Sequence, residues 1–99
     1  MYYAIFGYDV PNSLPLRKQV REQHLSRIQE LANVGRVLVG GPHPAIDSED
    51  PGESGFTGSL IIAEFPSLKD AEHWASEDPY TTSGVFSHVE VKPFKIVIP

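Results

Sequence analysis

The order of extended and helical segments constrains the fold of this 99-residue chain more than any single residue does. Aromatic and aliphatic side chains alternate over residues 2–9, which predicts a strand. A helix is expected over residues 13–33, with Pro15 in its first turn and Gly35 as its stop signal. The sequence RVLVGG over residues 36–41 then predicts a second short strand.

The second half of the chain continues with a loop, a strand, a helix and a strand. Residues 42–55 are rich in Pro, Gly, Ser and acidic side chains and are expected to form the surface loop. A third strand is predicted over residues 57–65. The helix that follows opens at Ser67 in the manner of a capping box and ends before Pro79. A last extended segment is expected over residues 88–98.

The predicted order is therefore β-α-β-β-α-β. With right-handed crossovers this order gives a ferredoxin-like α+β fold, a four-stranded antiparallel sheet with both helices on one face. We expect a single domain over residues 1–99. Because the strands carry apolar side chains on both faces, the face without helices also needs a cover. A homodimer that pairs the two open faces is the simplest solution.

Composition narrows the classes of partner. Thirteen acidic residues against eight basic ones leave a net charge of −5, which argues against nucleic acid and anionic membranes as partners. The lack of cysteine excludes disulfides and a thiolate zinc site. There is no basic leader and no run of about 18 apolar residues, so we expect a cytoplasmic protein.

His24 lies in the apolar stripe of the first predicted helix. The apolar positions that recur at helical spacing are Leu16, Val20, Ile28 and Leu31. At about 100° per residue they span roughly 0° to 120°, and His24 falls at roughly 80°. Its imidazole should therefore point inward, either bonded to a backbone carbonyl in the core or lining a cleft where it serves acid–base chemistry. Arg17 and Arg27 project near the same arc, and we expect their long stems to reach solvent.

Two carboxylates could orient this imidazole. Asp78 follows the second helix, which neighbours the first in the expected fold, and Asp9 ends the first strand. A carboxylate bonded to one ring nitrogen fixes the tautomer and stabilises the imidazolium, which makes a minimal general acid–base unit. The sequence leaves both partners open. Ser59 lies outside any G-x-S-x-G motif, so proton transfer is favoured over acyl-enzyme chemistry.

Other motifs carry weaker signals. The Gly40-Gly41-Pro42 segment is too short for a phosphate-binding loop. It indicates either a strand end with unusual backbone angles or a close approach of backbone amides to a small ligand. The four histidines lack metal-ligand spacing, so we expect no metal and no cofactor. His73 and His88 are expected to face solvent.

Several sequence blocks together resemble the YciI-like (YCII-related) family. The blocks are R-x-x-H-L at residues 21–25, GRVLVGGP at 35–42, GFTGS at 55–59, DPY at 78–80 and VKPF at 91–94. They extend almost from end to end of the chain. The family belongs to the dimeric α/β-barrel superfamily, in which two ferredoxin-like subunits pack sheet to sheet. The resemblance therefore implies the same homodimer.

The resemblance also implies a pocket with His24 and Asp78 as catalytic residues. Four further residues from the same blocks are implied to bind substrate: Arg21, Gly41, Pro42 and Tyr80. Family relatives include a dehydrochlorinase that acts on a chlorinated hydroxyquinol, and muconolactone isomerase is a more distant relative. The implied function is a lyase or isomerase that uses His–Asp acid–base chemistry on a small cyclic or carbonyl compound.

Two other functions stay open from the sequence. One is a non-catalytic dimer that binds a small ligand or serves as an accessory protein, with the same pocket but no turnover. The other is a purely structural interaction module, which predicts a filled cavity and a His24 bonded to the backbone.

Overall fold

The structure is a computed structural model that describes residues 1–99, and it confirms the predicted β-α-β-β-α-β order. A short 3-10 helix and a short third helix are added to that order. Along the chain the elements are β1 (Tyr2–Asp9), α1 (Leu14–Asn33), β2 (Val37–Pro44), η1 (Gly52–Ser54), β3 (Phe56–Glu64), α2 (Leu68–Ser76), α3 (Pro79–Thr82) and β4 (Phe86–Phe94).

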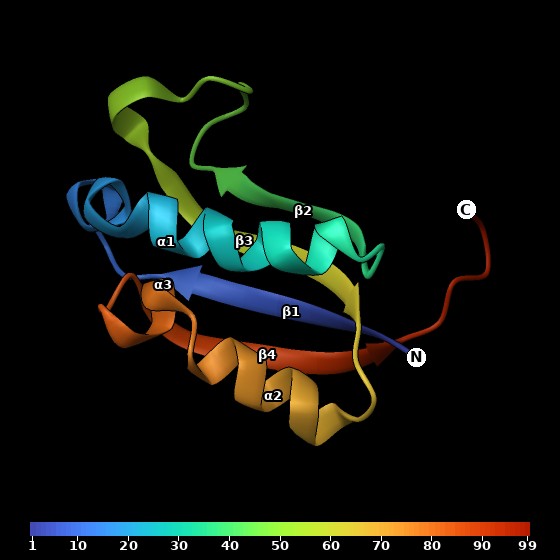
Figure 1. Ribbon diagram of the computed structural model, residues 1–99. Helices are drawn as coiled ribbons and strands as arrows, with labels where there is room; N and C mark the ends of the chain where they lie inside the picture. The colour runs from blue at the N-terminus through green and yellow to red at the C-terminus, as the bar shows by residue number, and fades with distance from the viewer.

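The four strands form one antiparallel sheet in the order β2-β3-β1-β4. The two longer helices, α1 and α2, lie on the same face of this sheet, and no element covers the opposite face (Figure 1). Strands β1 and β3 are central, as the apolar run of β3 predicts. The ferredoxin-like α+β arrangement expected from the sequence is therefore confirmed.

Strand register divides the side chains between the two faces. The main core lies between sheet and helices and consists of Tyr3, Ile5, Leu31, Ile61, Ala63, Phe65, Ala71 and Ala75. The alternate residues of the central strands point to the open face, where Ala4 pairs with Ile62 and Phe6 pairs with Leu60. Val39 of β2, which is 51% exposed, lies opposite Ile62 on the same face. The open face is consequently apolar at its centre.

Strand β2 is longer than the sequence suggests. The sequence predicts that it ends at Gly41, but it pairs with β3 as far as Pro44. Because β2 is an edge strand, its two prolines do not interrupt a ladder on both sides. Neither Gly40 nor Gly41 has a positive φ, so the expectation of unusual backbone angles at this segment is wrong. The last strand spans Phe86–Phe94, and the residues after it leave the sheet (Figure 1).

Helix α2 begins as its capping box predicts. The Ser67 hydroxyl accepts a hydrogen bond from the Asp70 backbone N–H at 3.1 Å and donates to the Asp70 carboxylate at 2.9 Å. The helix ends after Ser76, and α3 follows at once. Asp78 caps α3, because its Oδ1 accepts from the Tyr80 backbone N–H at 2.8 Å. This cap holds the Asp78 carboxylate inside the protein.

Gly7 of β1 leaves space for the ring of Phe86, which packs against Tyr80 of α3. A Cβ atom at this position would lie 2.4 Å from the Phe86 ring. Phe86 in turn meets the Tyr80 ring edge to face, with centroids 5.6 Å apart and an angle of 89° between the rings. Tyr80, Val85 and Phe86 form a small second core that anchors α3.

Candidate functional site

His24 and Asp78 form a buried pair between α1 and the start of α3. Nδ1 of His24 lies 2.7 Å from Oδ1 and 2.9 Å from Oδ2 of Asp78. The two side chains are only 7% and 4% exposed. Of the two carboxylates that the sequence left open, Asp78 is therefore the one that contacts His24. A carboxylate, not a backbone carbonyl, satisfies the buried imidazole.

This contact determines which ring nitrogen is free. An ionised carboxylate only accepts hydrogen bonds, so Nδ1 of His24 carries the proton that bonds Asp78. In the neutral imidazole Nε2 is then unprotonated. The hydrogen bonds of His24 within the protein involve Nδ1 and not Nε2, and His24 lines a cleft. The side chain thus presents a base to the cleft, backed by a carboxylate that stabilises the imidazolium.

Tyr80 fixes the plane of the same imidazole. The two rings are stacked with centroids 3.8 Å apart and an angle of 7° between them. Burial raises the pKa of the Tyr80 phenol above its ordinary value of 10.0, although the nearby charges of Arg17 and Arg21 oppose this shift. The phenol is therefore neutral at physiological pH. Tyr80 serves as an uncharged platform for His24.

Asp9 belongs to a second buried pair. Arg17 donates from Nε to Oδ2 of Asp9 at 2.6 Å and from Nη2 to Oδ1 at 2.9 Å. Arg17 Nη2 also donates to the Gly58 carbonyl at 3.0 Å, and the Ser13 hydroxyl donates to Asp9. The expectation that Arg17 reaches solvent is wrong, since the residue is 6% exposed. The bidentate hydrogen bonds to the Asp9 carboxylate offset the free-energy cost of burying the Arg17 guanidinium.

A cleft of about 180 Å³ lies beside His24, between α1 and strands β2 and β3. The residues that the sequence singled out and that line it are Arg21, His24, Gly41, Pro42 and Tyr80. Asp78 stands behind His24 and does not line the cleft. The structure therefore brings all six predicted site residues into one place.

Sequence reasoning missed several lining residues. They are Arg17, Leu25, Ile28, Ser59 and Ile61, whereas Gly40 belongs to the segment for which the sequence already offers close approach to a ligand. Strand periodicity carries a usable signal for part of this set, because Ser59 and Ile61 are two residues apart on β3 and share a face. Gly40 lies opposite Ile61 across the β2–β3 ladder. Arg17 precedes His24 by two helical turns on α1, which places both on one side of that helix.

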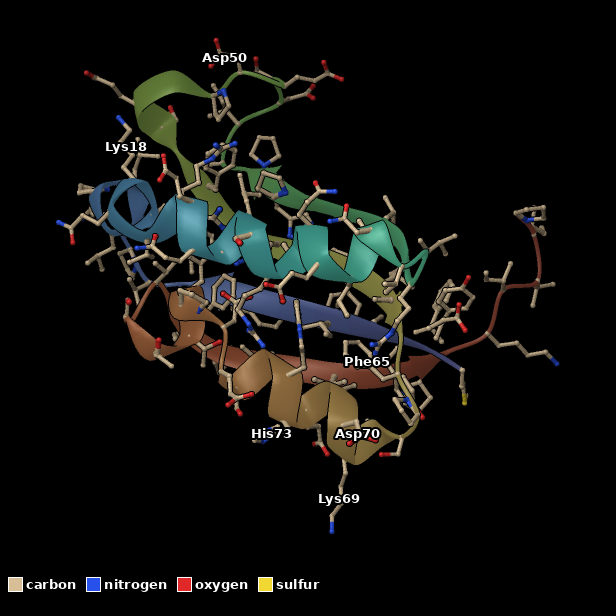
Figure 2. The ribbon with its side chains drawn as sticks, viewed as in Figure 1. Lys18, Asp50, Phe65, Lys69, Asp70 and His73 are labelled. Carbon is tan, nitrogen blue, oxygen red and sulfur yellow. The ribbon has the colours of Figure 1, made fainter.

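The remaining histidines lie outside this site. The side chains of His73 and His88 are 75% and 59% exposed, as expected. His73 projects from α2 away from the sheet (Figure 2).

No group of three or more His, Asp or Glu side chains is arranged to hold a metal ion. None of the helices combines the length and apolar character that crossing a membrane requires.

Fold and site together define a ferredoxin-like α+β domain with a histidine–aspartate pair in the wall of a small cleft. The YCII-related domain family matches residues 1–95, and the chain belongs to this family. The family resemblance drawn from the sequence blocks is thereby confirmed.

Proteins of similar sequence and a solved structure of similar fold agree with this assignment. An uncharacterised protein of Haemophilus influenzae and the protein YciI of Escherichia coli are each 55% identical to this chain over 97 residues, which cover 98% of this chain and 99% of theirs. The solved structure of 5-chloro-2-hydroxyhydroquinone dehydrochlorinase from Burkholderia phenoliruptrix, in complex with 2,5-dihydroxybenzoquinone, superposes with a TM-score of 0.84. It is 28% identical, and the match covers 96% of this chain and 94% of that one.

Proposed function

We propose that this protein is a lyase or isomerase for a small cyclic or carbonyl compound, with His24 as the general acid–base and Asp78 as its orienting partner. The observation that carries the proposal is how the two ring nitrogens of His24 are bonded. Its Nδ1 is bonded to a buried carboxylate, while its Nε2 has no protein partner and its ring lines the cleft. The dehydrochlorinase relative supports it, because that protein is named for an elimination and is bound to a small ring.

In this function Nε2 of His24 takes a proton from the bound compound. The charge that forms on the imidazole is stabilised by Asp78, and the stacked Tyr80 ring keeps the imidazole in place. The proton then returns to a different atom in an isomerisation, or a leaving group departs with its electron pair in an elimination. A positioned acid–base group of this kind contributes about 10²–10⁴-fold in rate.

Exchange of carbon-bound hydrogen with solvent deuterium tests this step without knowledge of the physiological substrate. Cyclic ketones and lactones with acidic C–H groups are incubated with the protein in D₂O and followed by proton NMR. Chloride release from 5-chloro-2-hydroxyhydroquinone is measured in parallel. We expect catalysed exchange or chloride release that His24→Gln abolishes and that the exposed control His73→Gln leaves intact. Catalysis that survives in His24→Gln would contradict the proposal.

Absence of catalysis together with ring binding in the cleft would instead indicate the alternative, a small-ligand-binding protein. The remaining alternative, a purely structural module, predicts a filled cavity and a backbone partner for His24. The open cleft and the Asp78 contact both argue against that module.

We further propose that two copies of the chain pair their open sheet faces in a homodimer. The face is apolar at its centre around Phe6, Leu60 and Ile62, and no element of the chain covers it. Val39 and Tyr8, 51% and 38% exposed, extend the same face. Burial of this surface against an identical surface removes apolar area from water, which favours association.

A further inference from the structure

The cleft beside His24 differs in charge from the protein as a whole. The chain contains thirteen acidic and eight basic residues. No aspartate or glutamate lines the cleft, whereas Arg17 and Arg21 both do. The side chains that line the candidate substrate site of this negatively charged protein are therefore cationic or neutral, and the nearest carboxylates, Asp9 and Asp78, lie behind the lining in contact with Arg17 and His24. A cavity with this lining attracts anions.

Only Arg21 carries a charge that is free for a ligand. The charge of Arg17 is matched by the buried Asp9 carboxylate. Arg21 is exposed and makes no ion pair or hydrogen bond with any residue of the chain. Arg21 and Tyr80 both line the cleft, and the charge of Arg21 opposes the rise in the pKa of the Tyr80 phenol.

The rest of the lining restricts the shape of the ligand. Leu25, Ile28 and Ile61 supply apolar walls. The volume of about 180 Å³ is close to that of cavities of about 150 Å³ that accept benzene, so one six-membered ring with small substituents fits. Ser59 lines the same space, and its hydroxyl forms no hydrogen bond with another side chain or with the backbone of the protein. It can donate to an oxygen on the ring.

We propose that the cleft selects a small planar organic anion, a ring with an ionised carboxylate or enolate-type oxygen, which Arg21 binds through its charge and Ser59 through a hydrogen bond. This inference takes the cleft as the substrate site of the function proposed above. It gives Arg21 a second role as well. When His24 removes a proton from carbon, negative charge develops on the substrate, and a guanidinium at the cleft stabilises it.

Benzoate and benzamide test the inference, because they have nearly the same size and shape but differ in charge. Their dissociation constants are measured by amide NMR titration, with the backbone N–H groups of Gly40 and Gly41 as reporters in the cleft. We expect the wild-type protein to bind benzoate about tenfold or more tightly than benzamide, the size of a hydrogen bond to a charged group. Benzoate affinity should also fall as salt is added, since Arg21 is exposed.

Variants separate charge recognition from a general electrostatic effect. Arg21→Gln should weaken benzoate binding about tenfold and leave benzamide binding unchanged. Arg21→Lys should retain part of the preference, and Ser59→Ala should weaken binding of both ligands. Lys18→Gln removes one positive charge from the same helix, at a residue that does not line the cleft and instead lies beside a hollow with Asp50. It should leave the ratio of the two dissociation constants unchanged.

Several outcomes would overturn the inference. These are equal binding of benzoate and benzamide by the wild type, no binding of benzoate in the cleft, and a preference that survives Arg21→Gln. Benzoate undergoes no proton transfer from carbon, so the titration is independent of turnover. An anion preference without deuterium exchange would contradict the proposed function alone, and exchange without an anion preference would contradict this inference alone.

Discussion

The imidazole of His24 lies parallel to the phenol ring of Tyr80, with centroids 3.8 Å apart. Asp78, two residues before Tyr80, bonds Nδ1 of the same imidazole and caps the helix that carries Tyr80. One short turn of chain therefore supplies both the partner that fixes the tautomer of His24 and the ring that fixes its plane. Helix α3 and its N-cap residue therefore position the imidazole of His24, the candidate base.

Asp78→Asn should lower catalysis and preserve the fold. Asparagine is as good an N-cap as aspartate, so α3 should still form. The amide lacks the charge that stabilises the imidazolium and no longer enforces a proton on Nδ1. We expect the rate of deuterium exchange or chloride release to fall by about 10²–10⁴-fold. Circular dichroism and the unfolding midpoint serve as controls, and a rate close to that of the wild type would exclude a positioning role for Asp78.

Arg17→Met should destabilise the protein strongly. The substitution leaves the Asp9 carboxylate, 1% exposed, without its cationic partner. Loss of one member of a buried ion pair costs about 3–5 kcal/mol in the free energy of unfolding, whereas replacing both members by apolar residues is often close to neutral. Urea unfolding should therefore show that the double variant Arg17→Met/Asp9→Leu recovers most of the free energy of unfolding that the single variant Arg17→Met loses. A single variant within about 1 kcal/mol of the wild type would contradict this role.

Tyr80→Phe should make the protein less sensitive to alkali. The pKa of Tyr80 is raised in the folded state, so the folded phenol holds its proton more tightly than the unfolded one. The contribution of this tighter proton binding to the free energy of unfolding is fully present below about pH 10. It is lost as the pH rises through the pKa of Tyr80 in the folded protein. The free energy of unfolding, measured below and above about pH 10, should fall less steeply in Tyr80→Phe. Tyr2→Phe controls for loss of a phenol elsewhere, and equal slopes in Tyr80→Phe and wild type would refute the expectation.

Val39→Asp should dissociate the proposed homodimer. Val39 lies on the open sheet face and is 51% exposed in the single chain, so the substitution should not disturb the monomer fold. In the dimer it would bury a charge without a partner. Light scattering after size exclusion should give a dimer for the wild type and a monomer for Val39→Asp. Leu68→Asp, on α2 away from that face, should stay dimeric. A monomeric wild type would rule out the homodimer.

Periodicity and element order made much of this structure predictable. The spacing of apolar residues on α1 placed His24 on the inward face, and His24 is 6% exposed. The β-α-β-β-α-β order placed the turn that contains Asp78 next to that helix, and the two side chains are in contact. Both inferences depend only on local spacing and on the handedness of crossovers.

Other features depend on tertiary contacts that local patterns do not encode. Burial of Arg17 requires Asp9 and the Gly58 carbonyl, which belong to two different strands. The Asp78-Pro79 dipeptide is as typical of the end of one helix as of the start of another, so the sequence does not predict α3. The length of β2 depends on its edge position, where prolines are tolerated.

Nitrogen-15 NMR of the His24 side chain provides the most direct test of how the site is built. Two-bond correlations between ring protons and ring nitrogens report which nitrogen carries the proton in the neutral imidazole. We predict a proton on Nδ1 and an unprotonated Nε2 in the wild-type protein, because Nδ1 is bonded to Asp78. Asp78→Asn should mix the two tautomers. A wild-type imidazole that carries its proton on Nε2 would contradict the proposal that His24 presents a base to the cleft.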